Sequence, residues 1–283
     1  MYGAILGDIL GSIYEFHNLK TDEPEKIDLL NPDCYYTDDT VLTVAVADAI
    51  LSGGDYQAAV HGWARRFPRA GYGDSFARWI CSDDPRPYNS WGNGSAMRVS
   101  PVGWAFDTIE ETLEQAKRSA EITHNHPEGI KGAQATAAAI FLARTGASKE
   151  AIREFIVERF SQPGREDDGY TLHRTAAEIR PGYQFNESCQ GTVPEAITAF
   201  LESRDFPHCM RLSISLGGDT DTLACIAGGV AEAFYGTDAI PRDMRDFAFN
   251  RLPRSMTEVV ERFYGERMSL RGASGGIVKP DSD

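Results

Sequence analysis

Apolar residues recur at intervals of three and four along most of the chain, and short polar breaks separate these segments. Such spacing is typical of helices with a buried face. The predicted helices span residues 3–16, 41–51, 56–67, 108–122, 129–144, 148–160, 171–179, 192–203, 205–216, 221–235, 242–250 and 255–268. Almost no segment alternates strictly, as a strand would. We therefore predict one compact all-α domain over residues 1–272 and a disordered tail over 273–283.

The longest interruption of this pattern, residues 68–103, is rich in Gly, Pro, Ser and Asn and is predicted to be irregular. Long loops in compact domains are usually functional. Backbone amides in its glycine-rich centre, residues 88–98, could hold phosphate oxygens, and Trp91 could pack on a sugar or base. A packed surface loop without a ligand accounts equally well for these residues, because the known nucleotide-binding glycine motifs are absent.

Two short motifs place carboxylates and hydroxyls in front of apolar helices. Residues 217–222 read Gly-Gly-Asp-Thr-Asp-Thr, and residues 37–40 read Thr-Asp-Asp-Thr. Helix capping is one explanation, since Asp and Thr are good N-cap residues and negative charge is favourable at a helix N-terminus. The glycine pair also allows a turn in which Asp219 and Asp221 converge as hard oxygen ligands. The motif by itself leaves both explanations open.

The first predicted helix carries Gly3, Gly7, Gly11 and Glu15 on one face, four residues apart. Each glycine costs a helix interior roughly 1 kcal/mol relative to Ala. The spacing therefore predicts close packing against another helix beside the carboxylate of Glu15, which we interpret as a site residue. Asp8 is expected instead to be a buried acid whose hydrogen bonds fix a loop.

Composition narrows the class of function. The 283 residues carry a formal net charge of −14, which disfavours general binding to nucleic acids and anionic membranes. The five cysteines show no zinc-type spacing, and no apolar run reaches the roughly 18 residues of a membrane span. We expect a soluble, cytoplasmic protein, in which the His-x-His at residues 124–126 lines a pocket rather than binding zinc.

The acidic motifs become informative if the fold brings them together. Two carboxylates about 4 Å apart repel by about 4 kcal/mol at an effective dielectric constant near 20, so a cluster requires protons, basic partners or cations. No Lys or Arg closely flanks either motif. All-oxygen ligands select Mg²⁺, Mn²⁺ or Ca²⁺, and the spacing of an EF-hand is absent. A two-metal carboxylate site fits these residues better.

Five motifs, in this order, resemble the ADP-ribosylglycohydrolase family. They are Gly-Asp-Ile-Leu-Gly at 7–11 with Glu15 and Phe16, Thr-Asp-Asp-Thr at 37–40, Ser-Trp-Gly-Asn-Gly-Ser-Ala-Met-Arg at 90–98, Thr-His at 123–124, and Gly-Asp-Thr-Asp-Thr at 218–222. The resemblance covers nearly the whole chain. It implies an orthogonal multi-helix domain with two Mg²⁺ or Mn²⁺ ions at the bottom of an ADP-ribose cleft.

The resemblance also implies roles for particular residues. The implied metal ligands are Thr37, Asp38, Asp39, Asp219, Asp221 and Thr222. The implied substrate-binding residues are Ser90, Trp91, Gly92, Asn93, Gly94 and His124. Glu15, Asp39 and Asp221 are the catalytic candidates, with Glu15 as general base or acid. Asp74 is a further candidate for the cleft rim, although an exposed turn acid accounts for it at least as well.

The activity implied is hydrolysis of the bond between ADP-ribose and a modified acceptor, with protein arginine preferred and ADP-ribose as the product. O-linked serine or acetyl conjugates are alternative substrates. Two rival classes are a non-catalytic ADP-ribose-binding or structural relative, and a metal-independent glycoside hydrolase that uses Glu15 and Asp39. We expect a monomer that acts on an ADP-ribosylated protein or a small ADP-ribose conjugate.

Overall fold

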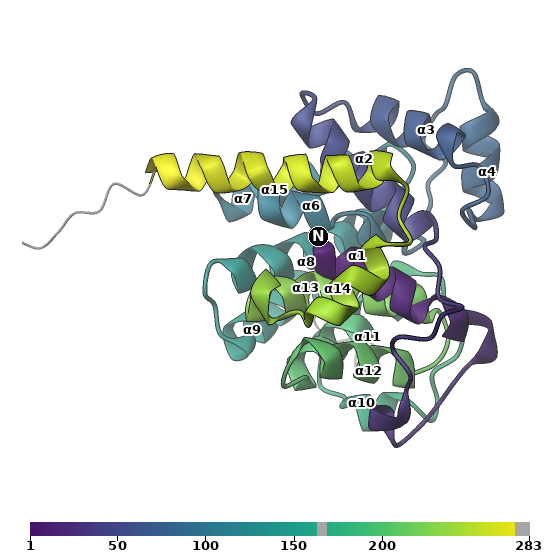
Figure 1. Cartoon of the computed structure of the whole chain (residues 1–283), viewed down its shortest axis with the longest axis vertical. Helices are drawn as coiled ribbons and strands as arrows, with labels where there is room; N and C mark the ends of the chain where they lie inside the picture. The colour runs from purple at the N-terminus through teal and green to yellow at the C-terminus, as the bar shows by residue number, and fades with distance from the viewer. Residues whose placement is uncertain (163–168, 275–283) are drawn as a thin grey trace, which may run out of the picture.

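Helices form nearly all of the regular structure in the computed structural model, which describes residues 1–162 and 169–274 (Figure 1). The α-helices are α1 Tyr2–Gly11, α2 Asp38–Leu51, α3 Tyr56–Arg66, α4 Asp74–Cys81, α5 Gly94–Met97, α6 Ser100–Ala105, α7 Ile109–Glu121, α8 Pro127–Arg144, α9 Lys149–Phe160, α10 Ala176–Ile179, α11 Cys189–Glu202, α12 Phe206–Ser215, α13 Thr220–Tyr235, α14 Arg242–Phe249 and α15 Arg254–Ser274. The 3₁₀ helices are η1 Ser12–His17, η2 Pro24–Lys26, η3 Gly169–Thr171 and η4 Thr237–Ala239. The described residues contain no strand, only an isolated antiparallel bridge between Gly92 and Ser188. The all-α prediction is confirmed.

The helices α1 and α13 form the central pair of the molecule (Figure 1). A Cβ atom on Gly3 would lie 2.1 Å from the carbonyl oxygen of Gly228, and one on Gly7 would lie 2.0 Å from that of Ala224. Side chains larger than hydrogen cannot fit at these distances, so the two backbones touch directly. The close packing predicted from the glycine spacing is confirmed.

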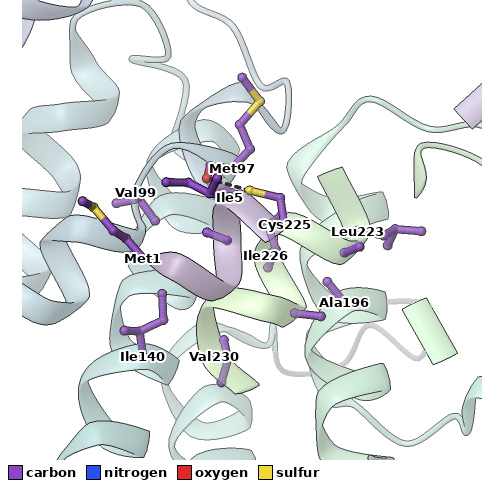
Figure 2. Packing of buried hydrophobic residues seen from close by; sticks show 14 of the residues in the cluster. Met1, Ile5, Met97, Val99, Ile140, Ala196, Leu223, Cys225, Ile226 and Val230 are labelled. Carbon is purple, nitrogen blue, oxygen red and sulfur yellow. Dashed lines mark hydrogen bonds between the residues drawn. The ribbon is translucent and has the colours of Figure 1, made fainter. Parts of the chain in front are cut away.

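The apolar core surrounds this pair (Figure 2). Ile5 of α1 and Ile226 of α13 pack with Ile140 of α8, and all three are buried. The thiol of Cys225 donates a hydrogen bond to the carbonyl oxygen of Met97, which links α13 to α5. Burying a large apolar side chain stabilises a fold by about 1.5–3 kcal/mol, so this core holds the N-terminal end of α13 in place. Among the described residues, no helix has the length and apolar character that crossing a membrane requires.

The predicted irregular stretch at 68–103 contains three helices, so that part of the prediction is wrong. In α4, Phe76, Trp79 and Ile80 form a buried face at helical spacing, but eight residues between Gly- and Pro-rich flanks give too short a pattern to detect. The helices α5 and α6 are shorter still. Residues 68–73 and 82–93 remain irregular, and the second of these stretches includes the first half of the glycine-rich segment.

Two other predicted helices are shorter than expected. The first α-helix ends at Gly11 and continues as the 3₁₀ helix η1, in which the hydroxyl of Ser12 donates to the carbonyl oxygen of Ile9. The predicted helix 171–179 is reduced to η3 and α10, because Leu172 between them has a left-handed φ of 49°. Residues 273 and 274, predicted as tail, end α15, and the rest of that tail lies outside the described residues.

Candidate active site

The acidic turn before α13 has the geometry that its glycine pair allows. Gly217 and Gly218 have φ values of 75° and 72°, in the left-handed region that favours glycine. Asp219 occupies the N-cap position of α13, yet its side chain accepts no hydrogen bond from the helix. Its Oδ2 atom instead accepts one from Nδ2 of Asn93, at 2.7 Å. Capping therefore does not occupy this carboxylate.

Three carboxylates converge at this turn. Oxygen atoms of Glu15, Asp219 and Asp221 all lie within 4.8 Å of one another. Glu15 comes from η1 and is half-buried, whereas the two aspartates are buried. The cluster joins the end of the glycine-bearing segment to the second acidic motif, which are 200 residues apart in the chain.

The first acidic motif begins α2 and faces the same cluster. Asp39 is buried, and its Oδ2 atom has no hydrogen-bond partner among the described residues. The negative charge of Asp39 is one of the causes that raise the pKa of Asp221. A buried carboxylate oxygen without a donor needs an explanation, and a bound cation is one that the neighbouring carboxylates favour.

The carboxyl groups of the site have raised pKa values, because burial and neighbouring negative charges disfavour their ionised forms. Burial, followed by the charges of Asp219 and Asp8, raises the pKa of Glu15 to about 7. Burial, followed by the charge of Asp8, raises the pKa of Asp38 to about 8. The pKa values of Asp39 and Asp221 lie well above the ordinary range, again from burial first and neighbouring aspartates second. All-oxygen groups that repel one another in this way fit a hard divalent cation.

Asp8 belongs to the support of the site. Its carboxylate accepts hydrogen bonds from the backbone N–H of Thr37 at 3.0 Å and from that of Thr40 at 3.1 Å. Both threonine hydroxyls donate to it as well. Asp8 thus fixes the entry to α2, as predicted. The hydroxyl of Thr37 also accepts from the backbone N–H of Asp39, so it acts as the N-cap of α2.

A cavity of about 530 Å³ runs from Asp38 of the first acidic motif along the glycine-rich segment. Its lining includes the predicted residues Asp38, Asp74, Ser90, Gly92, Asn93, Gly94 and His124. A neighbouring cavity of about 600 Å³ shares Ser90 and Gly92 and adds Trp91. Asp74 is exposed at the start of α4 and lines the cleft, so it is both a rim residue and an exposed acid. The structure therefore brings the predicted substrate-binding residues into one cleft.

His124 forms a wall of this cleft. Its Nδ1 atom lies 2.7 Å from the hydroxyl of Thr123, which also accepts a hydrogen bond from the buried Arg98. Burial, and then the charge of Arg98, holds the pKa of His124 well below its usual value, so the ring is neutral. A Cβ atom on Gly94 would lie 3.2 Å from that ring. His126 is instead the N-cap of α8 and lines neither of the two cavities, so only the first histidine of the pair has the predicted position in a pocket wall.

Sequence reasoning missed one wall of the cleft, the segment 183–188. The backbone N–H of Asn93 donates to the carbonyl oxygen of Glu187 at 2.7 Å. The ring of Tyr183 lies 2.8 Å from the position that a Cβ atom on Gly218 would take. The segment thus spans from the acidic turn to the glycine-rich segment, and Glu187 lines both cavities. A polar connection between helices gave no pattern from which this position could be predicted.

Comparison with known proteins identifies the family of the chain. The family model described as ADP-ribosylglycohydrolase matches residues 1–271. The chain is 29% identical over 313 residues to the mouse (Mus musculus) ADP-ribosylhydrolase ARH3, covering 84% of this chain and 83% of that protein. It is 25% identical over 272 residues to the ADP-ribosylarginine hydrolase Tri1 of Pseudomonas putida (strain GB-1), covering 85% and 71%.

A solved structure described as an ADP-ribosylglycohydrolase-related protein complex superposes with a TM-score of 0.66. It shares 26% sequence identity, and the match covers 87% of this chain and 93% of that one. Sequence and fold therefore agree over almost the full length. The protein belongs to the ADP-ribosylglycohydrolase family and is a hydrolase of that family.

Proposed function

We propose that this enzyme cleaves the glycosidic bond between ADP-ribose and an arginine side chain of a modified protein, and that it requires two divalent cations. The observation that carries the proposal is the convergence of Glu15, Asp219 and Asp221, which Asn93 of the cleft lining contacts through its hydrogen bond to Asp219. A relative at 25% identity is named an ADP-ribosylarginine hydrolase, which supports the choice of acceptor.

The cations would be Mg²⁺ or Mn²⁺. The residues that would hold them are Thr37, Asp38, Asp39, Asp219, Asp221 and Thr222. When bound, such ions offset the repulsion among carboxylates and polarise substrate oxygens. The unpartnered Oδ2 atom of Asp39 and the short distances among the other acids support this ligand set.

The remaining residues of the cleft bind and orient the substrate or transfer a proton. Gly92 and Gly94 line the cavity, where a backbone without side chains leaves room for a pyrophosphate to approach. Asn93 holds Asp219 in place through its side-chain amide. In the reaction, a water oxygen bonds to the anomeric carbon, the bond to the acceptor nitrogen breaks, and the acceptor leaves with a proton. Glu15, half-buried at the edge of the cluster, is the group that we assign to take or supply that proton.

The test is release of ADP-ribose from an ADP-ribosylarginine peptide, followed by chromatography. We expect turnover with Mg²⁺ or Mn²⁺ and none after EDTA treatment. Glu15→Gln should retain binding of ADP-ribose and lose turnover by roughly 10²-fold or more. Full activity in EDTA would reject the cations and favour a metal-independent mechanism. Binding of ADP-ribose without release from any conjugate would indicate a non-catalytic relative.

A further inference from the structure

The exposed large apolar side chains of the described residues gather at the cleft. They are Phe16, Tyr35, Trp91 and Phe185, with exposed fractions of 76%, 48%, 53% and 45%. Phe16 and Tyr35 line a cavity of about 570 Å³ beside η1, and Trp91 and Phe185 line the cavity of about 600 Å³. Scattered apolar residues are normal on a surface, but a group of aromatic rings around one cleft marks a binding surface.

Two of these rings face each other from opposite walls. The ring centroids of Phe16 and Phe185 are 6.3 Å apart, and the ring planes differ by 22°. Phe16 follows Glu15 directly in η1. Phe185 lies between Tyr183, which packs on Gly218 of the acidic turn, and Glu187, whose carbonyl oxygen binds Asn93. The pair therefore lies beside the acidic cluster. It also lies between the two outer cavities, which are the cavity of about 570 Å³ and the cavity of about 600 Å³.

The position of Phe185 is fixed by contacts on both sides of it. Lys20 donates hydrogen bonds to the carbonyl oxygens of Pro181 and Tyr183, which ties the segment to the residues after η1. Asn186 accepts a hydrogen bond from the backbone N–H of Ser188 at 2.9 Å. The segment 183–188, which contains Phe185, is thus bound to the residues that follow η1, which contains Phe16.

Carboxylates lie around the pair, together with His17, which lines the cavity beside η1, and Lys20, whose amino group is bound to the carbonyl oxygens of Pro181 and Tyr183. The residues that line the two outer cavities include Asp33 and Glu187 but neither Lys nor Arg. Glu15 adds a third carboxylate next to Phe16. Aromatic faces attract cations within about 6 Å of the ring centroid, and a planar guanidinium suits such faces better than an ammonium. A neutral hydroxyl acceptor would gain nothing from these groups.

We propose that Phe16 and Phe185 determine the specificity for the acceptor by packing against the guanidinium of the modified arginine while ADP-ribose occupies the inner cleft. This inference rests on the proposed function and adds to it the residues that recognise the leaving group, the arginine side chain. Phe16 and Phe185 act on substrate recognition, whereas the acidic cluster acts on the reacting bond.

The test compares Phe16→Leu, Phe185→Leu and the double variant with the wild type. Leucine keeps an apolar side chain and removes the aromatic face. Each enzyme is assayed on an ADP-ribosylarginine and an ADP-ribosylserine peptide, and the affinity for free ADP-ribose is measured by calorimetry. Phe155→Leu on α9 is the matched control, because Phe155 is half-buried and lines none of the cavities at the cleft.

We expect kcat/KM on the arginine peptide to fall by roughly 5- to 30-fold in the double variant, mainly through KM. Activity on the serine peptide and affinity for ADP-ribose should stay within about 2-fold of the wild-type values. Equal losses on both peptides, weaker ADP-ribose binding, or no loss would overturn the inference. A wild type that cleaves only the serine peptide would overturn both this inference and the arginine acceptor of the proposed function, and would leave only an ADP-ribosyl hydrolase. A wild type that cleaves neither peptide contradicts the proposed function itself.

Discussion

The two ends of the α1–α13 pair both hold buried acids, and the surroundings of these acids are opposite. At one end, the carboxylate of Glu232 accepts hydrogen bonds from the amino group of Met1 at 2.7 Å, the backbone N–H of Gly3 at 2.8 Å and the hydroxyl of Tyr264 at 2.6 Å. At the other end, Glu15, Asp219 and Asp221 face one another within 4.8 Å.

This difference shows that burial of an acid does not by itself identify a site. A buried carboxylate is stable when donors surround it and costly when it is unpaired. The fold itself supplies the donors around Glu232, as it does around Asp8. It supplies few around Asp221 and none to Oδ2 of Asp39 within the described chain. Acids without internal donors are therefore the ones for which an external partner must be sought.

The variant Asp221→Asn is the strongest test of this difference between the two ends of the helix pair. We expect kcat/KM to fall by roughly 10³-fold or more, because a bound cation supplies several kcal/mol of charge stabilisation and this variant removes one of its ligands. Stability in EDTA should not fall, since the change removes a charge that its neighbours repel and keeps the oxygen that accepts from the backbone of Thr222. Steady-state kinetics and urea unfolding in EDTA measure the two effects.

Glu232→Gln should give the reverse result. Removing one partner of a buried ionic group leaves the other uncompensated, so we expect unfolding to become easier by roughly 3 kcal/mol. Activity per folded molecule should remain at the wild-type level, because Glu232 lies at the far end of the helix pair. Urea unfolding and active-site titration together test this. Loss of activity without loss of stability would mean that both ends of the pair take part in the reaction.

The same contrast explains what could be predicted from the sequence. The acidic motifs lie at helix starts, where capping residues and the apolar runs that follow mark them, so Asp39 and Asp221 could be paired across the chain. The glycine face of α1 predicted close packing against another helix, but not which helix this is. The wall formed by residues 183–188 could not be predicted, because Phe185 and Glu187 reach the cleft through a bridge and backbone hydrogen bonds that leave no periodic pattern.

The shortness of some helices set the other limit on what could be predicted from the sequence. A helix as short as α4 presents three buried residues, which a Gly- and Pro-rich neighbourhood obscures. Likewise, the spacing of Gly3, Gly7 and Gly11 does not reveal that the α-helix ends at Gly11, because that depends on the hydroxyl of Ser12 and on the packing of η1. Periodicity thus gave the core helices and missed the elements that shape the cleft.

Addition of Mg²⁺ should stabilise the wild type and reveal which acids it binds. A ligand at 100 times its Kd stabilises the folded state by about 2.7 kcal/mol, which raises the melting temperature measured by calorimetry. We expect the rise in the wild type and in Glu232→Gln, and its loss in Asp221→Asn. If Mg²⁺ stabilised all three equally, its binding site would lie elsewhere and the cluster would need another partner.

The smallest effect concerns the helix contact that holds both ends together. In Gly7→Ala the new methyl would lie 2.0 Å from the carbonyl oxygen of Ala224, so the helices must separate. Overpacking of this kind costs roughly 1–3 kcal/mol. In Gly62→Ala, on α3, no atom lies within 4 Å of the new methyl, and the higher helix propensity of alanine should add up to about 1 kcal/mol.

Because α1 leads directly into η1, Gly7→Ala should also move Glu15 relative to Asp219 and Asp221. We therefore expect it to lower kcat on an ADP-ribosylarginine peptide, whereas Gly62→Ala leaves kcat unchanged. Unfolding curves and kinetics on the two variants separate these outcomes. Wild-type kcat in a destabilised Gly7→Ala protein would show that the acidic cluster is positioned by α13 alone, and the glycine face would then serve only stability.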